Sequence, residues 1–371
     1  MKRVRIGFIG AGWAVRNRHL PLLKEIPGVE LGPIWSRNPA KAREVASEFG
    51  FARVLDDWQD VIQDPEQDAV VIATPPILHH PATLAALRAD KHVLCQARMA
   101  RNLKEAQEMT RAAQASALVT GLYPARPGLK GERVMLRLLH QEGFVGEIQE
   151  VRVTAMELAP PKETYEWARD PDVVGVHAMN LGMWVEVLNR WVGPATRVMA
   201  TGTIHHRKRK TYDGDWVDAA VPDSLAVVAD LECGATASYH FSTGAAGGPG
   251  SSIEIYGSRG ALAYQLFVEE IRGASGAGAG WQPIPIPAEE AGSQTIDTDF
   301  VQAIRSGGPV SPDFAEGLRY MEFCEAVALS MKTGSLVSIA ELQPRMDSWG
   351  RLLDVQDSSS ASGTGSSPQR L

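Results

Sequence analysis

The stretch VRIGFIGAGWAVRNRHLPLL, residues Val4 to Leu23, decides the fold. Its first residues are mostly apolar and predict a short buried strand. The turn that follows reads Gly10-Ala11-Gly12, and the later apolar positions recur with helical spacing. A strand, a glycine turn and a helix in this order are typical of a dinucleotide-binding fingerprint.

The fingerprint also predicts how a nucleotide would be held. Gly10 permits the tight turn, and Gly12 lets the backbone approach a pyrophosphate, which would bind the amides at the helix start. Val15 replaces the third glycine of the usual pattern, so we expect slightly looser packing of helix on strand. The predicted cofactor-binding residues of this stretch are Gly10, Gly12, Trp13, Ala14 and Val15. An ordinary strand-to-helix turn is the alternative interpretation.

Composition narrows the class of protein. The chain has 371 residues, 44% of them hydrophobic, which suggests two globular domains. A net charge of -7 disfavours nucleic acids and anionic membranes as partners. Its three widely spaced cysteines suit a reducing compartment and show no metal-ligand spacing. This cysteine spacing gives no reason to expect a bound metal. No apolar stretch is long enough to span a bilayer, and together with the cysteine usage this predicts a cytoplasmic protein.

Strands and helices are predicted to alternate through residue 122. After the first strand, we expect strands at Val29 to Ser36, Asp68 to Ala73, Lys91 to Cys95 and Ala117 to Leu122. This order is typical of an α/β fold with a doubly wound parallel sheet, so residues 1–122 are predicted to form an N-terminal Rossmann domain. Ligands of such sheets lie beyond the carboxyl ends of the strands.

The residues at those strand ends are therefore candidates for the cofactor site. Behind the second strand come Ser36, Arg37, Asn38 and Lys41, whose hydroxyl and cationic groups favour the extra phosphate of NADP over NAD. The alternative is an arginine and a lysine solvated at a helix start. Behind the next two strands, the candidates are Ala73, Thr74, Pro75, Pro76, His79, Gln96, Ala97 and Arg98.

Several longer motifs resemble the Gfo/Idh/MocA family of sugar and polyol dehydrogenases. They are GFIGAGWAVRNRHLPLL from Gly7, DAVVIATPPILHHPATLAALRADKHVLC from Asp68, GEIQEVRV from Gly146, GVHAMNLGMW from Gly175 and IEIYGSRGAL from Ile253. The resemblance spans about residues 4 to 340. It implies a Rossmann domain followed by a C-terminal α/β domain with an open, mostly antiparallel sheet. It also implies a nicotinamide cofactor and hydride transfer at a substrate carbon that bears oxygen.

The chain departs from the family at the motif that supplies its catalytic lysine. The family has Glu-Lys-Pro after the KHVLC strand, and the lysine transfers a proton at the substrate oxygen. This chain has Gln96, Ala97 and Arg98 there. Alanine cannot carry a proton, and a guanidinium stays protonated, although it could bind an anionic group of the substrate or cofactor.

A second departure falls in the family motif Asp-x-Gly-x-His-x-x-Asp. The preferred alignment places Gly175, His177 and Asn180 at the glycine, the histidine and the final aspartate, because it keeps the histidine. In the other alignment, Asn180 to Trp184 mimics Asp-x-Gly-x-His. The predicted catalytic residues are His177, Asn180 and Tyr123, with water as a further proton source. A structural histidine at a helix end is the alternative role for His177.

Residues 123–356 are predicted to form the substrate and oligomerisation domain, and residues 357–371 a disordered tail. Residues 179–191 should be a mostly buried helix. The polar segment before this helix is a candidate for lining the cleft. Its candidate residues are Lys162, Tyr165, Trp167 and Arg169. The basic run 205–210 is expected to be a solvated hairpin and the glycine-rich run 273–280 a loose turn. Ser311 or Asp313 should cap a helix that follows.

Two functions remain open from the sequence. One is an oxidoreductase that prefers NADP over NAD and transfers hydride to or from a sugar, polyol or related hydroxy or keto compound. The other is a non-catalytic protein that binds a nucleotide or a sugar with the same fold. In either case, one face of a broad second sheet needs cover, so a homo-oligomer, dimer or tetramer, is expected.

Overall fold

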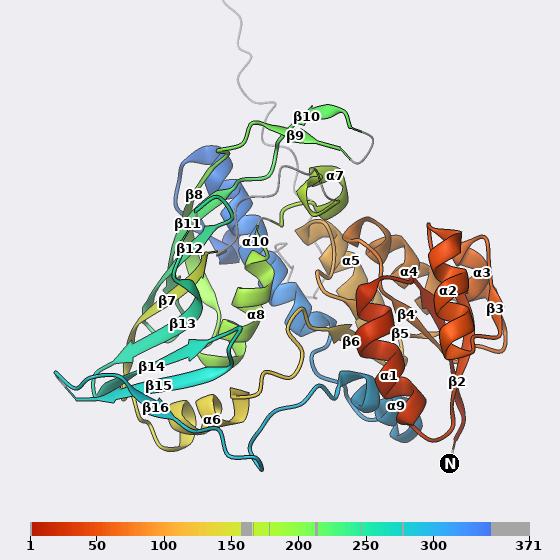
Figure 1. The fold of residues 1–371 in the computed structure, drawn as a ribbon, viewed down its shortest axis with the longest axis horizontal. Helices are drawn as coiled ribbons and strands as arrows, with labels where there is room; N and C mark the ends of the chain where they lie inside the picture. Colours follow the sequence, from red (N-terminus) through yellow and green to blue (C-terminus); the bar gives the residue numbers. More distant parts are fainter. Residues whose placement is uncertain are drawn as a thin grey trace, which may run out of the picture.

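The computed structural model describes residues 2–156, 165, 167–177, 179–211, 214–245, 247–276 and 278–342. The predicted tail lies outside these residues, as does Lys162. The chain forms two sheets with helices between and around them (Figure 1). None of the described helices is both long and apolar enough to cross a bilayer.

The N-terminal sheet confirms the Rossmann prediction. Within the described residues it has six parallel strands in the order β3-β2-β1-β4-β5-β6. They are β1 (Val4–Ile9), β2 (Val29–Trp35), β3 (Arg53–Val54), β4 (Ala69–Ile72), β5 (His92–Gln96) and β6 (Thr120–Tyr123). The central strand β4 is buried throughout, as its continuous apolar run predicts.

Helices cover both faces of this sheet (Figure 1). They are α1 (Leu20–Glu25), entered through a π-helical turn at Val15–His19, α2 (Pro39–Phe49), α3 (Trp58–Gln63), α4 (His79–Arg88), entered through a 3₁₀ turn at Pro76–Leu78, and α5 (Leu103–Gln114). Asn38, Asp57 and Asn102 start α2, α3 and α5, each accepting a backbone N–H with its side chain.

The second sheet is open and mostly antiparallel, as the resemblance implies. In the described part of the chain its nine strands run in the order β16-β15-β14-β13-β7-β12-β11-β8-β17, and only β7 and β12 pair in parallel. They are β7 (Ile148–Met156), β8 (Ala195–Thr203), β11 (Ser224–Leu231), β12 (Thr236–Ser242), β13 (Gly250–Gly257), β14 (Gly260–Gln265), β15 (Glu270–Ser275), β16 (Gln282–Ile284) and β17 (Val337–Ser338).

Two predictions for this domain need correction. The run 273–280 is not only a loose turn, because its first residues belong to β15 and pair with β14. The basic run does form a hairpin, β9 (Lys208–Lys210) with β10 (Trp216–Asp218). It is not fully solvated, however, since Arg209 is completely buried against Asp223.

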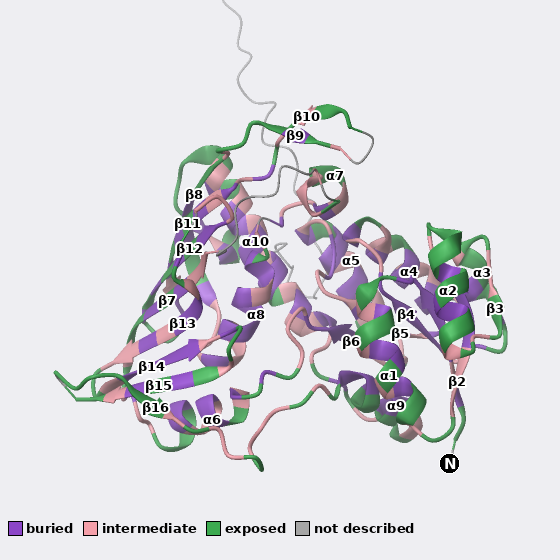
Figure 2. Cartoon of the chain, in the orientation of Figure 1, coloured by how far each residue is buried: buried purple, intermediate pink, exposed green. Residues whose placement is uncertain are grey.

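Two helices, α8 (Leu181–Trp191) and α10 (Phe314–Thr333), lie between the second sheet and the Rossmann domain (Figures 1 and 2). Trp184 of α8 packs edge-on against Phe241 of β12. Phe323 of α10 packs against Tyr239 of the same strand. Asp313 caps α10 in a capping box with Glu316, which confirms one of the two predicted caps. This layer forms one wall of the site described below.

The chain returns to the first domain near its end. Helix α9 (Ile296–Ser306) packs its apolar face against β1 and α1, so Phe300 shares a core with Val4. The same contact contains two buried polar side chains, and Nδ1 of His19 lies 2.7 Å from Oδ1 of Asp297. The remaining short helices are α6 (Glu132–Leu136), a π-helical turn at Arg137–Gln141, α7 (Pro171–Val174), and 3₁₀ turns at Trp167–Arg169 and Ile339–Glu341.

Candidate active site

A cavity of about 410 Å³ lies where the carboxyl ends of β1, β4 and β5 face α8 and α10. The Rossmann domain contributes Gly12, Trp13, Ala14, Ala73, Thr74, Pro75, Pro76, Gln96, Ala97 and Arg98. The second half of the chain contributes Ala125, Trp167, Asn180, Gly182, Met183, Glu186 and Tyr320. The cavity thus brings together most of the predicted cofactor-binding residues and one predicted catalytic residue, Asn180.

The fingerprint turn has the geometry that a dinucleotide needs. Gly10 adopts φ +122°, and a Cβ there would lie 2.2 Å from the Ala73 carbonyl oxygen, so only glycine fits. A Cβ on Gly12 would meet nothing within 4 Å, which leaves open space above the backbone. The first amides of the helix beyond lack acceptors within the helix. These features fit a pyrophosphate, although Val15 itself is fully buried and faces the core.

The residues predicted to select NADP lie beside this turn, outside the cavity lining. The Gly10 amide donates to the Trp35 carbonyl at 2.7 Å, which places the end of β2 next to the turn. Asn38 caps α2, and the Ser36 hydroxyl accepts from the Asn38 amide at 3.3 Å. Arg37 and Lys41 are exposed beside this cap, where they can approach a ribose phosphate.

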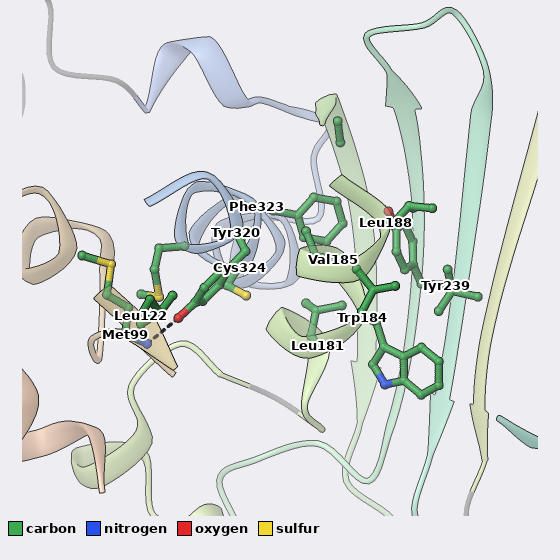
Figure 3. Packing of buried hydrophobic residues seen from close by; sticks show 14 of the residues in the cluster. Met99, Leu122, Leu181, Trp184, Val185, Leu188, Tyr239, Tyr320, Phe323 and Cys324 are labelled. Atoms are coloured by element: carbon green, nitrogen blue, oxygen red, sulfur yellow. Dashed lines mark hydrogen bonds between the residues drawn. The ribbon is translucent and has the colours of Figure 1, made fainter. Parts of the chain in front are cut away.

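The segment Gln96 to Arg98 is fixed from two sides. The Ala97 amide donates to the Tyr123 carbonyl at 2.8 Å. On the other side, the Met99 amide donates to the hydroxyl of Tyr320, which reaches it from α10 (Figure 3). The backbone that replaces the Glu-Lys-Pro motif is therefore held between the last Rossmann strand and the second domain.

His79 lies behind this wall and outside the cavity lining, although it was predicted to bind the cofactor. Its ring nitrogens lie 2.7 Å from the carbonyl oxygens of Thr74 and Arg98. Burial lowers the pKa of His79, whereas its contacts with the two carbonyl oxygens oppose that shift. We conclude that His79 connects two loops of the site.

Arg98 enters the cavity wall as a cation without an acidic partner among the described residues. One terminal nitrogen, Nη2, donates to the Asn180 side-chain oxygen. The other, Nη1, is buried and has no hydrogen-bond partner in the part of the chain that the structure describes. The guanidinium carbon lies 5.8 Å from the centre of the Trp167 ring. Burial lowers the pKa of Arg98, which still remains a cation at neutral pH.

Asn180 belongs to both alignments of the aspartate–histidine motif, so its place directly before α8 does not choose between them. The Tyr320 ring packs against Gly182, 3.0 Å from the position that a Cβ would take. In the second alignment, Trp184 takes the histidine position, and it is buried in the core. Neither residue at the motif's two polar positions is an acid or a histidine.

The structure does not place the other two predicted catalytic residues in the cavity lining. His177 is 2% exposed, and its Nε2 donates to the Ala100 carbonyl at 2.8 Å. Burial, helped by the nearby Arg98 charge, lowers the pKa of His177 to about 3, so it stays neutral. Tyr123 is fully buried, and its hydroxyl accepts from Gln294 at 3.0 Å. Burial raises its pKa to about 12. Both placements argue against direct proton transfer.

Glu186 is a titratable residue of the cavity that the sequence did not single out. It lies on the face of α8 that also carries Gly182 and Met183, and it is 6% exposed. Its Oε1 accepts from Nη1 of Arg190 at 2.8 Å. Burial raises the pKa of Glu186 to about 7, although Arg190 opposes the shift. A signal was available, because Glu186 and Arg190 form an i,i+4 pair inside an otherwise apolar helix.

Glu132 of α6 completes this polar cluster. Its Oε1 accepts from Nε of Arg190 at 2.8 Å and from the Trp191 indole at 3.2 Å. Arg190 therefore divides its charge between two carboxylates. This sharing leaves Glu186 less strongly paired than an isolated ion pair would, which suits a group that changes its protonation state.

Comparisons with known proteins agree with this architecture. Residues 4–122 match a family model described as "Oxidoreductase family, NAD-binding Rossmann fold", and residues 134–263 match the "GFO/IDH/MocA C-terminal domain". Levoglucosan dehydrogenase from Pseudarthrobacter phenanthrenivorans is 24% identical over 92% of this chain and its own full length. The scyllo-inositol 2-dehydrogenase (NADP(+)) of Bacillus subtilis is 34% identical over 38% of this chain and 43% of its own.

Solved structures show the same fold over most of the chain. Levoglucosan dehydrogenase in complex with NADH and levoglucosan superposes with a TM-score of 0.76, at 24% identity over 91% of this chain and 99% of that one. An oxidoreductase domain protein from Kribbella flavida superposes with a TM-score of 0.78. It is 22% identical, and the match covers 91% of this chain and 100% of that one. Together with the two family models and the site geometry, these likenesses show that the chain belongs to the Gfo/Idh/MocA family of oxidoreductases.

Proposed function

We propose that the protein is an NAD(P)-dependent oxidoreductase that transfers hydride to or from a carbon bearing a hydroxyl or keto oxygen in a sugar, polyol or related compound. The supporting observation is that one cavity joins the fingerprint turn, the segment after β5 and the start of α8. The names of the relatives, which include levoglucosan and inositol dehydrogenases, support the substrate class.

The residues present divide the work of binding between the two halves of the chain. Gly10 and Gly12 admit the pyrophosphate, and the Thr74 to Pro76 loop forms the wall beside it. Trp13 is 66% exposed and offers a broad ring at the cavity mouth. When bound, the nicotinamide supplies or accepts the hydride. Asn180 and Trp167 line the cavity from the second domain and would position the substrate.

Glu186 is our candidate for the group that transfers the proton that must accompany the hydride. Ala97 at the family's lysine position cannot carry one, and His177 and Tyr123 lie outside the cavity lining. Deprotonated Glu186 would accept the hydroxyl proton in oxidation, and protonated Glu186 would return it in reduction. Its pKa of about 7 makes both forms available near neutrality.

The first test is an absorbance assay of nicotinamide reduction and oxidation. The purified full-length protein is incubated with each nucleotide and a panel of sugars and polyols, and nucleotide binding is measured in parallel by calorimetry. Substrate-dependent turnover is the expected result. Tight nucleotide binding without turnover across the panel would instead favour the non-catalytic binding protein.

Arg37 is expected to select NADP. We predict that Arg37→Ala weakens NADPH binding by about tenfold, because one charge-assisted hydrogen bond to the 2′-phosphate is lost at an exposed site. NADH binding should not change. The measurement is a calorimetric titration with both nucleotides. Arg88→Ala, at the end of α4 and therefore at the opposite edge of the sheet, is the matched control. Equal losses for NADPH and NADH would refute the NADP preference.

A homo-oligomer also remains our proposal. The outer face of the second sheet carries exposed apolar side chains, including Met199 at 48% and Val228 at 53%. These residues lie on adjacent strands, where β8 pairs with β11. Such a face is typical of an interface between copies. Sedimentation velocity measures the oligomeric state directly, and a monomer at all concentrations would exclude a homo-oligomer.

A further inference from the structure

We propose that the substrate carries an anionic group, a carboxylate or a phosphate, and that Arg98 binds it. This inference rests on the proposed function and narrows the substrate class within it. A neutral sugar or polyol would then be a poorer ligand than its acidic counterpart.

The charges around the cavity carry the argument. Its lining contains two charged side chains among the described residues, Arg98 and Glu186. Glu186 is already paired with Arg190, which in turn is paired with Glu132. Among the described residues, Arg98 has only the neutral amide of Asn180 at its terminal nitrogens. No described carboxylate therefore pairs with its guanidinium.

Partial burial makes this unpaired charge costly. The Nη1 atom of Arg98 is shielded from solvent and has no acceptor among the described residues. A guanidinium taken out of water loses hydration that a neutral amide replaces only in part. Because it offers five N–H donors in a planar fork, it can still bind a carboxylate or phosphate through two parallel hydrogen bonds. An anionic ligand would supply the charged partner that the Arg98 guanidinium lacks.

The surroundings of Arg98 hold it ready for such a ligand. Asn180 fixes Nη2, and the Trp167 ring lies over the guanidinium. On the far side, the neighbouring residue Met99 is held by Tyr320. Ala97, at the position of the family's lysine, brings no second cation next to Arg98. A single fixed cation favours one anionic group at one end of a hydroxylated ligand.

The test is a calorimetric titration of the full-length protein, saturated with its preferred nucleotide, with glucose, glucuronate and a hexose phosphate. We expect at least one of the two anions to bind about 30-fold or more tightly than glucose, as for a buried charge pair. The anion that binds more tightly identifies the group. In Arg98→Met, which keeps an unbranched apolar stem but removes the charge, this preference should disappear.

Two further variants separate charge from folding. Asn180→Asp places a carboxylate against Arg98 and should abolish the preference with the arginine still present. Arg101→Met makes the same change in an arginine that is paired with Glu105 outside the cavity lining, and it should keep the preference. Equal binding of all three ligands to the wild type would overturn the proposal. So would a loss of nucleotide affinity in Arg98→Met with the preference intact, since Arg98 would then serve the cofactor.

The outcome is distinguishable from a failure of the proposed function. Binding is read out as heat, so it does not depend on turnover. If the anion preference is found but no nucleotide is oxidised or reduced, the anion site stands and the oxidoreductase activity does not. If turnover is found with neutral sugars and there is no anion preference, the oxidoreductase activity stands and the anion site does not.

Discussion

Replacing Glu186 by glutamine should lower turnover by roughly 10²–10⁴-fold, the usual contribution of a general acid–base group. The substitution keeps the size of the side chain and its place on α8, but an amide neither gains nor loses a proton near neutral pH. Nucleotide affinity should not change. Turnover is measured with the substrate that the absorbance screen identifies, and affinity is measured by calorimetry.

The pH dependence gives this prediction its sharpest form. Burial raises the pKa of Glu186 to about 7, and the negative charge of Glu132 contributes to the rise. Oxidation needs the deprotonated form, so its rate should increase as the pH rises through about 7, whereas the rate of reduction should fall. The charged or titratable groups that face Glu186 are Arg190, Glu132 and Tyr320.

Glu132→Gln is the matched control. It removes a carboxylate from the same cluster without touching the cavity lining, so turnover should persist. Loss of the Glu132 charge should also shift the pH profile of oxidation to lower pH, because that charge helps keep Glu186 protonated. If Glu186→Gln retained wild-type turnover with an unshifted pH profile, the proton would have to pass through water or another residue.

The sequence predicted the Rossmann half of the site well for a simple physical reason. Parallel strands place their carboxyl ends at one edge, so each strand predicted from its apolar run also located a loop of the site. Gly12, Thr74 and Ala97 met in one cavity because of this rule. The resemblance added the second sheet, whose alternating strands do not by themselves show which edges pair.

The contribution of the second domain was harder to predict. Whether Asn180 or His177 reaches the cavity depends on where α8 begins, and helix ends are poorly marked in sequence. Glu186 looked like a residue of a buried helix, because its function depends on a cavity that only packing creates. Tyr320 lies 134 residues further along the chain (320 − 186), and no local pattern links the two.

Asp223 likewise could not be singled out from the sequence, because its partners lie on other elements. We expect it to hold one side of the second domain together. It is fully buried before β11. Its Oδ1 accepts from Arg209 and from Arg169, the latter at 3.1 Å. Its Oδ2 accepts from the amides of His205 and His206 at 3.0 and 2.9 Å. One carboxylate thereby joins the β9–β10 hairpin to the turn that carries Trp167 of the cavity.

We predict that Asp223→Asn lowers the free energy of unfolding by about 3–5 kcal/mol, since it removes one partner of a buried ion pair. The matched control is Asp230→Asn on β11, whose carboxylate pairs with Arg197 at the surface. An exposed pair contributes at most about 1 kcal/mol, so this variant should be nearly as stable as the wild type. Urea unfolding compares the three proteins, and hydrogen exchange at residues 203–211 locates the effect.

Acid should remove the advantage of the wild type over Asp223→Asn. Burial alone would raise the pKa of Asp223, but the His206 amide and the two arginines outweigh burial and lower it. A lowered pKa in the folded state means that the stabilisation is complete above the unfolded-state value and is lost as the pH falls through the folded-state value. The difference in unfolding free energy should therefore be constant near neutral pH and shrink only in strong acid. A difference that was already small at neutral pH would show that the hairpin is held by its other contacts.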